Sequence, residues 1–383
     1  MQNQTLSLMF RLLRRELDAA PEPETLTLTE TEAEALLALS DRFGLAHLVG
    51  DALFKAGTTL PEKTAAAFRD RLDRALYRYC FLDRELNSMG ALFEAERIPY
   101  IPLKGAVMRR YYPETWMRGS SDLDVLIHPE DLERAEAALT SRLSYRRMDG
   151  SSHDVAFMSS ANIRVELHFR LMEANRANDA GTLLNETWAH ASSAGDSFRY
   201  ELDAPVFLYY HLAHMAKHLE NGVNCGVRPF LDLWILDRRE EFRGEACDSL
   251  LREGKMTAFA GQCRKLIGVW MEARAHDEDT ERFERYLFEE EEGKKMALKT
   301  ARHRSRAGTA LSMLVPSFDY MKNKSSVTRK HPWLTPFLYI RRWCKLFSPE
   351  KLKSTIRSLR TMAHLKKDQQ NEARLLMQRL GLK

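Results

Sequence analysis

The chain has 383 residues, of which 44% are hydrophobic and 29% are charged, with few glycines and prolines. This composition excludes disordered and fibrous classes and suits a globular protein with one or two cores. Arginines interrupt the apolar run near the N-terminus, and no segment reaches the roughly 18 uncharged apolar residues that suggest a membrane-spanning helix. The five cysteines form no Cys-x-x-Cys pair. This argues against a zinc ribbon or a disulfide framework and favours a cytoplasmic location.

The charge is unevenly distributed, although the net charge is only +4. Residues 294–383 carry 22 Lys or Arg against 4 Asp or Glu, whereas the rest of the chain is net acidic. Clustered cations release counterions when they meet phosphates, so this basic part is a candidate for binding RNA or another polyanion, such as an anionic membrane surface. Its aromatic residues, Trp333 and Trp343 among them, could stack on bases. Core aromatics beside solvated cations would give the same pattern.

The first 97 residues predict helices. Leu6–Leu17 has helical spacing, and Thr29 with Glu32 predicts a capping box at the start of a second helix. In Ala65–Arg97, apolar residues recur at intervals of three and four, which predicts one long amphipathic helix.

From Ile98 onward the pattern alternates between strands and helices. Strands are expected at Tyr100–Leu103, Leu123–Ile127, Tyr145–Met148, Val155–Met158 and Ile163–Phe169, and helices at Gly105–Tyr112 and Pro129–Leu139. Later helices are expected at Pro205–Leu219, Pro229–Arg239, Leu250–Trp270 and Arg282–Arg302, and residues 305–345 are expected to be helical or partly loop.

These patterns predict a mostly helical α+β protein in four regions. A helical N-terminal region (1–97) precedes an α/β core with a small mixed sheet (98–200). A further helical region (201–302) and a basic helical region (303–383) follow.

Two carboxylates stand at the start of one predicted strand, in the run Asp122-Leu123-Asp124-Val125. Residues two apart on a strand point to the same face, so both acids project together while Leu123 and Val125 face a core. Carboxylates at this spacing suit Mg²⁺, which commonly bridges one or two carboxylates to substrate phosphates. The spacing alone is weak, because Asp277 and Asp279 repeat it in a charged stretch.

A third acid follows in the run Ile163–Arg170, where strict alternation puts Arg164, Glu166, His168 and Arg170 on one face of a strand. If that strand neighbours the one with Asp122 and Asp124, Glu166 reaches the same metal ions and could help to accept a proton from an attacking hydroxyl. An exposed edge strand would show the same alternation.

Lys104 and Gly105 stand between a predicted strand and a predicted helix. Glycine lets the backbone approach a phosphate closely, the start of a helix offers unpaired N–H groups, and the lysine adds a cation. An ordinary strand-to-helix turn would have the same residues.

Together, Leu103-Lys104-Gly105, the run from Arg118 through Ser121 to Ile127, and Val165-Glu166-Leu167-His168 resemble the motifs of an uncharacterised bacterial nucleotidyltransferase family of the DNA polymerase β-like superfamily. The resemblance spans roughly Ile98–Asp237 and includes His211–His218 and Phe230–Leu233. It implies that the helical region 201–302 completes the nucleotide cleft.

The resemblance implies that Asp122, Asp124 and Glu166 bind two Mg²⁺ ions, with Mn²⁺ as an alternative. A nucleoside triphosphate would donate its nucleotidyl group to an acceptor hydroxyl and release pyrophosphate. One ion would activate the hydroxyl and the other would neutralise the leaving pyrophosphate.

Further residues are expected by resemblance to contact the nucleotide: Lys104, Gly105, Arg118, Ser121, His168, Lys217, His218, Arg228 and Asp232. One departure concerns Gly105, which lies 17 residues ahead of Asp122, farther than the superfamily's glycine turn usually lies. Gly119-Ser120 is too close to Asp122 to replace it.

Several alternatives stay open. His211, His214 and His218 share a broad helical stripe and could bind a metal with Cys225, or they could simply pack. The acceptor could be an RNA 3′ end, a protein side chain, a sugar or a small antibiotic. The whole protein could instead be an inactive nucleotide- or RNA-binding protein, or a tRNA-modifying toxin or defence component.

Overall fold

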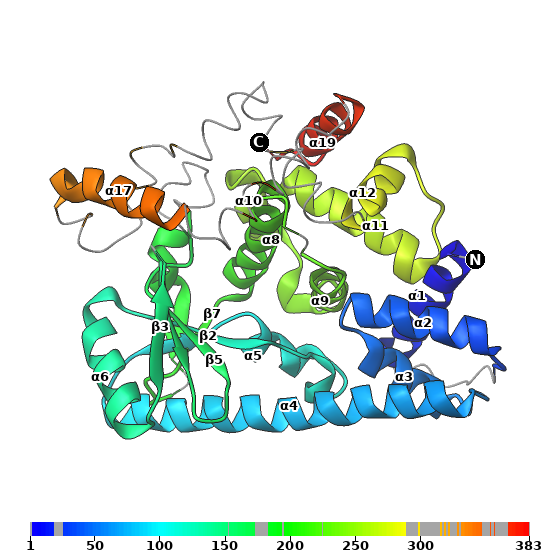
Figure 1. Ribbon diagram of the computed structural model, residues 1–383, viewed down its shortest axis with the longest axis horizontal. Coiled ribbons are helices and arrows are strands. Elements are labelled where there is room, and N and C mark those ends of the chain that lie inside the picture. Colours follow the sequence, from blue (N-terminus) through cyan, green and yellow to red (C-terminus); the bar gives the residue numbers. More distant parts are fainter. Residues whose placement is uncertain are drawn as a thin grey trace.

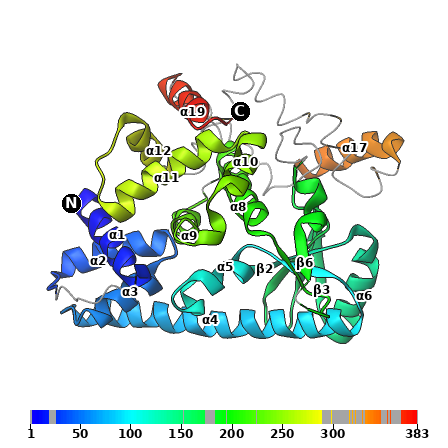
Figure 2. The same cartoon turned by 180° about the vertical axis from the view of Figure 1, so that it is seen from behind.

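A computed structural model describes residues 2–18, 26–151, 153–172, 183–193, 195–223, 225–288, 331–346 and 367–382, with isolated positions between 298 and 356. Helices dominate, and one small sheet lies beside them (Figures 1 and 2). The longer helices are α1 (Gln2–Asp18), α2 (Glu30–Arg42), α3 (Ala46–Lys55), α4 (Glu62–Ala95), α6 (Leu132–Arg142), α8 (Ala204–Glu220), α9 (Arg228–Leu236), α10 (Glu245–Glu253), α11 (Thr257–Glu272), α12 (Glu278–Phe288), α17 (Thr335–Leu346) and α19 (Lys367–Arg379).

The main sheet has five strands in the order β1-β2-β5-β4-β3. Their bounds are β1 (Tyr100–Pro102), β2 (Asp122–Ile127), β3 (Arg146–Gly150), β4 (Asp154–Met158) and β5 (Arg164–His168). β2 and β5 are parallel, and the other neighbours are antiparallel. A hairpin of β6 (Ala191–Ser193) and β7 (Tyr200–Leu202) lies next to β1. The predicted fold class, a mostly helical α+β protein with a small mixed sheet, is confirmed.

One face of this sheet is apolar and packs against helices. Leu123, Val125 and Val165 are fully buried there and share a core with Phe93 of α4 and Leu139 of α6. Because side chains alternate along a strand, the acids of β2 and β5 point to the opposite face. Because α4 and α6 cover the apolar face of the sheet, the opposite face is the one that carries the polar groups.

Helix α4 has 34 residues and runs along one side of the molecule, from the N-terminal helices to the sheet (Figure 1). The long helix predicted at Ala65–Arg97 is thus confirmed, with a start three residues earlier. The capping box of α2 is confirmed as well, since Glu32 N–H donates to Thr29 Oγ1 and Thr29 N–H donates to the Glu32 side chain.

A second core joins helices that are far apart in the sequence. Phe10 of α1 stacks on Trp270 of α11 with ring centroids 4.7 Å apart, and Phe230 of α9 meets the same indole edge-on at 5.2 Å. The N-terminal helices therefore pack against the helices after residue 204. The division into four regions stays a prediction.

Two predicted helices have different bounds in the structure. The prediction of one helix at Leu250–Trp270 is wrong. The helix is interrupted between α10 and α11, where Lys255 has a left-handed φ of 54°. Gly254 lets the chain approach Tyr209 closely, since an added Cβ would lie 2.2 Å from that ring. The helix expected at Arg282–Arg302 begins earlier, at Glu278, and its part beyond residue 288 lies outside the described continuous ranges.

The basic C-terminal region is described only in part. Trp333 is 69% exposed and Trp343 of α17 is 42% exposed, so these two aromatics are not core residues. No helix in the described ranges is both long enough and apolar enough to cross a membrane.

The contact between Gly254 and Tyr209 is testable. We expect Gly254→Ala to lower the free energy of unfolding by about 1–3 kcal/mol, because the added methyl group overpacks a closed site. Gly261→Ala on α11 is the matched control, since its Cβ would meet nothing within 4 Å. Replacing an open helical glycine should stabilise the protein by up to about 1 kcal/mol. Urea unfolding measures both, and equal effects would contradict the packing argument.

Candidate active site

The parallel pairing of β2 with β5 sets the geometry of the acidic face. Asp124 stands opposite Glu166 and Asp122 opposite Arg164, while Leu126 pairs with His168. Paired residues in adjacent strands share a face, so the three acids and His168 lie on one side of the sheet. The expectation that the two strands are neighbours is confirmed.

Asp124 is the most enclosed of the three acids, with 3% of its surface exposed. Its Oδ1 accepts a hydrogen bond from Lys104 Nζ at 2.7 Å and lies 2.8 Å from His168 Nε2. Burial opposes ionisation, but the hydrogen bond from His168 and the charge of Lys104 hold the pKa of the Asp124 carboxyl well below its usual range. Asp124 is therefore a carboxylate at any physiological pH.

Asp122 and Glu166 are more open than Asp124. The hydroxyls of Ser120 and Ser121 each lie 3.3 Å from Asp122 Oδ1. Glu166 accepts from Arg164 Nε at 2.8 Å, and its other oxygen lies 3.8 Å from His168 Nε2. The structure thus places Ser121 and His168 beside the acids, as their predicted roles require.

Lys104 reaches Asp124 because of the backbone on either side of it. Leu103 N–H donates to the Asp124 carbonyl at 2.9 Å, and Lys104 itself has a left-handed φ of 45°. Burial lowers the pKa of the Lys104 ammonium group, but interactions with Tyr210 and Asp124 outweigh this effect and raise the pKa above its ordinary value. An added Cβ on Gly105 would lie 2.9 Å from Ser120 Oγ. Gly105 thus permits close packing on the turn before β2, and its phosphate contact stays a prediction.

Helix α8 covers the acidic face with Tyr210, His214 and Lys217, which share one side of the helix. Tyr210 is 1% exposed, and its hydroxyl has no hydrogen-bond partner among the described residues. Burial is the main cause that raises the pKa of Tyr210, and the charges of Asp124 and Glu166 add to it. Sequence reasoning missed Tyr210, although its spacing of four from His214 and seven from Lys217 is the signal that could have found it.

His153 and Asp154 were also missed. Lys217 Nζ lies 3.4 Å from His153 Nε2, and burial together with the Lys217 charge lowers the pKa of His153 to about 4. Asp154 of β4 pairs in register with His168 of β5. No local motif marks these two residues, because only the sheet order brings them to the site.

The histidines of the predicted stripe on α8 contact different parts of the protein. His211 Nε2 lies 2.9 Å from the Pro229 carbonyl, away from the acids, while His218 Nε2 lies 3.3 Å from His214 Nε2. Within the described ranges, the side-chain groups able to converge on a metal are Asp124 with Glu166 and His168, and His153 with Asp154 and His168. Neither of these two groups in the described part of the chain contains His211, His214, His218 or Cys225.

A buried ion pair connects the approach to β2 with helix α9. Arg118 donates to Asp232 through Nε at 2.7 Å and through a terminal nitrogen at 2.8 Å, and the Tyr112 hydroxyl donates to the same carboxylate at 2.7 Å. Asp232 is fully buried, and Arg118 lowers the pKa of Asp232 against the opposing effect of burial. Arg228, on the same helix, donates to the Gly44 carbonyl at 3.0 Å.

The second Asp-x-Asp sequence has a different environment. The Thr280 N–H donates to Asp277 Oδ1 at 2.8 Å, so Asp277 caps the start of α12. Asp279 forms ion pairs with Arg282 and Arg379. Asp277 and Asp279 therefore serve helix α12, and the pair at Asp122 and Asp124 is the one that joins other acids.

Residues 29–272 match the model of a family described as uncharacterised nucleotidyltransferase. The match covers more than half of the chain and contains the sheet, the three acids and helix α8. The chain belongs to this nucleotidyltransferase family. The resemblance seen in the motifs from Ile98 to Asp237 is thereby confirmed, and the family segment is longer on both sides. No curated protein and no solved structure matches the chain.

In this nucleotidyltransferase, some of the predicted nucleotide-contacting residues lie beside the acids and others do not. Lys104, Ser121 and His168 adjoin the acids, and Lys217 adjoins His153 beside His168. Arg118 and Asp232 are instead paired with each other inside the protein. Their contact with a nucleotide, like that of Arg228 and His218, stays a prediction.

The ion pair of Arg118 with Asp232 is the second testable feature. Asp232→Asn leaves the Arg118 charge buried without a counter-charge, so we expect a loss of about 3–5 kcal/mol in unfolding free energy. The matched control is Glu245→Gln, which removes a surface ion pair with Arg252 and should cost less than about 1 kcal/mol. Chemical denaturation compares the two variants. A similar small loss in both would mean that the buried pair does not hold α9 in place.

Proposed function

We propose that this protein transfers a nucleotidyl group from a nucleoside triphosphate to an acceptor hydroxyl in a magnesium-dependent reaction. Membership of the nucleotidyltransferase family supports the transfer chemistry. The observation that carries the assignment is the register of β2 with β5, which brings Asp122, Asp124 and Glu166 to one face of the sheet.

The residues present fit a hard divalent cation. Asp122, Asp124 and Glu166 offer carboxylate oxygens, the ligands that Mg²⁺ and Mn²⁺ prefer. Donor atoms of Asp124, Glu166 and His168 lie within 4.8 Å of one another. When bound, two such ions would lower the pKa of the acceptor hydroxyl and neutralise charge on the leaving pyrophosphate.

The chain's own side chains would bind and orient the substrate. Lys104 and Lys217 carry ammonium groups near the acidic face, and the buried Tyr210 side chain interacts electrostatically with Lys104 and the acids. Together they can hold the triphosphate oxygens. We keep Gly105, Ser121, His168 and His218 as further nucleotide contacts. Arg118, Arg228 and Asp232 also stay predicted contacts, and the ion pair of Arg118 with Asp232 in addition holds α9 in place.

The transfer step needs no reactant other than the nucleoside triphosphate and the acceptor hydroxyl. The acceptor oxygen bonds to the α-phosphorus while the bond from that phosphorus to the bridging β-oxygen breaks. Pyrophosphate leaves with the electron pair of the broken bond. Glu166 is the partly exposed carboxylate that can take the hydroxyl proton.

The assignment predicts which aspartates matter. Asp122→Asn and Asp124→Asn should each lower transfer at least ~100-fold, because charge at the metal site is lost. Asp277→Asn is the matched control from the other Asp-x-Asp sequence, and asparagine also caps helices well. The assay follows label from each nucleoside triphosphate into total RNA or lysate protein with magnesium present. Undiminished transfer by the Asp122 and Asp124 variants would remove the basis of the proposal.

Tyr210 gives an independent prediction. Because its hydroxyl has no hydrogen-bond partner in the described ranges, Tyr210→Phe should leave the free energy of unfolding unchanged or slightly raised. It should raise KM for the nucleoside triphosphate roughly tenfold if the hydroxyl donates to a phosphate. In contrast, Tyr112→Phe removes the hydrogen bond to the charged Asp232 and should cost about 1.5–3 kcal/mol of stability. A Tyr210→Phe enzyme with wild-type kinetics would exclude the phosphate contact.

A further inference from the structure

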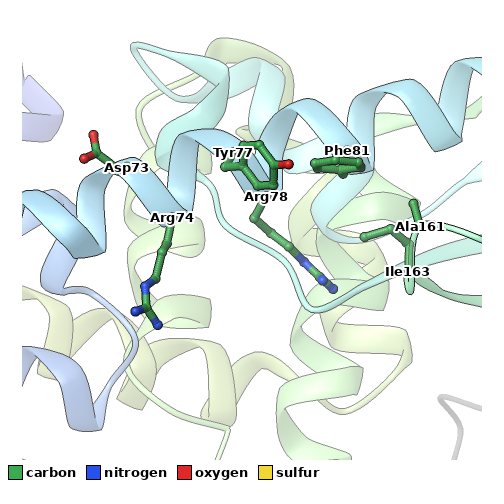
Figure 3. A pocket seen from close by; sticks show the side chains of 7 residues that line it. All are labelled: Asp73, Arg74, Tyr77, Arg78, Phe81, Ala161 and Ile163. Atoms are coloured by element: carbon green, nitrogen blue, oxygen red, sulfur yellow. The ribbon is translucent and has the colours of Figure 1, made fainter.

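The outer face of α4 carries two parallel rows of side chains (Figure 3). Tyr77 and Phe81 form the aromatic row, with ring centroids 4.7 Å apart, and Arg74 and Arg78 form the cationic row. Both rows have the spacing of four residues that aligns side chains on a helix. With Ile163 at the start of β5 they line an open groove of about 550 Å³.

One aromatic side chain of this groove is strongly exposed. Tyr77 is 69% exposed, whereas Phe81 is half-buried and packs against the sheet core. Among the described residues before position 300, the exposed large apolar side chains are Tyr77 and Leu76, and Leu76 lies outside the groove. Of the two rings in the groove, Tyr77 therefore has the larger surface on which a ligand can stack.

The groove reaches the edge of the sheet at which β2 and β5 begin. The Arg78 guanidinium donates to the carbonyl of Ser121, the residue immediately before Asp122. On the other wall, Ile163 precedes Arg164, which pairs in register with Asp122. A ligand lying along α4 would therefore pass over this edge to reach Asp122, because the acids point to the face of the sheet opposite α4.

We propose that this groove binds the 3′ end of a single-stranded nucleic acid, which is the acceptor in the proposed transfer. A row of rings beside a row of guanidinium groups matches the bases and the phosphate backbone, which run side by side along such a strand. A guanidinium has five N–H donors, of which the Ser121 contact of Arg78 uses one. The inference rests on the proposed function, because the free 3′ hydroxyl supplies the attacking oxygen.

One cation of the groove has no acidic partner. Arg74 pairs with Asp70 at 2.9 Å, and Arg84, 5.3 Å from the centre of the Phe81 ring, pairs with Glu85, whereas Arg78 forms no ion pair among the described residues. Asp73 is the acid among the lining residues, and it stands at the end of the aromatic row farther from Phe81 and Ile163 (Figure 3). Arg78 is therefore the cation that would contact the last internucleotide phosphate of the strand.

Fluorescence anisotropy tests this proposal on the full chain. The probes are labelled single-stranded RNA and DNA oligonucleotides of one sequence, each with a free 3′ end. Tyr77→Ala should raise Kd roughly tenfold through loss of one base stack, and Tyr77→Phe, which keeps the ring, should restore wild-type affinity. Trp333→Ala is the matched control, because Trp333 is exposed to the same extent, 69%, within the basic C-terminal region. Tighter binding of RNA or of DNA identifies the acceptor's sugar.

Two results would overturn the proposal. In one, Trp333→Ala weakens binding and Tyr77→Ala does not, which would move the nucleic acid to the C-terminal region. In the other, neither oligonucleotide binds wild-type protein, as expected for a protein or small-molecule acceptor. Magnesium-dependent binding of nucleoside triphosphate by wild-type protein, measured separately, reports on the proposed function itself. Nucleotide binding without oligonucleotide binding thus rejects the acceptor groove alone.

Discussion

The buried ion pair between Arg118 and Asp232 is the constraint on which the candidate site depends. Its two partners are 114 residues apart in the sequence, one just ahead of β2 and the other on α9. Because an ion pair inside a protein is stable only with its full set of hydrogen bonds, the bidentate geometry and the Tyr112 hydroxyl fix where α9 lies relative to the sheet. Helix α8, which contacts α9, is thereby held over the acidic face.

The short segment between Arg118 and Asp122 is held from several sides. Arg118 anchors it to α9, Arg78 of α4 donates to the Ser121 carbonyl, and the Ser120 hydroxyl donates to the Asp122 carbonyl at 2.9 Å. Gly105 packs against Ser120 from the helix that follows β1. The position of Asp122 is thus set by three different elements, as metal-binding and catalytic groups require.

The acidic face is also balanced in charge. Asp124, although almost fully buried, is ionised because Lys104 and His168 approach the same carboxylate oxygen. Two lysines and a buried tyrosine thus lie near the three carboxylates of this face. Such a mixture can bind both a cation and a polyphosphate, which a set of acids alone could not do.

Local patterns in the sequence predicted the parts of the site that lie on single elements. Alternation in Ile163–Arg170 placed Glu166 and His168 on one face, and the aliphatic run after Asp124 predicted its strand. Helical spacing was less decisive on α8, where almost every position from Val206 to Leu212 is apolar or aromatic and no single stripe stands out. His211 therefore seemed equivalent to His214, although only the latter faces the acids.

Features that depend on long-range packing were beyond prediction. Arg118 and Asp232 are charged residues in separate segments, and nothing local indicates that each is buried by the other. Their predicted contact with the nucleotide stays a prediction, but their pairing with each other could not be read from the sequence. His153 and Asp154 reach the site only because β4 lies beside β5, and the break after α10 depends on the approach of Tyr209 to Gly254.

The central claim is nucleotidyl transfer at the face formed by β2 and β5. The most direct measurement supplies wild-type protein and magnesium with two forms of the same nucleoside triphosphate, one labelled at the α-phosphorus and the other at the γ-phosphorus. The account predicts that α-label becomes covalently attached to the acceptor, while γ-label is released as pyrophosphate. Attachment of the γ-label to the acceptor would contradict it, because the protein would then be transferring a phosphoryl group.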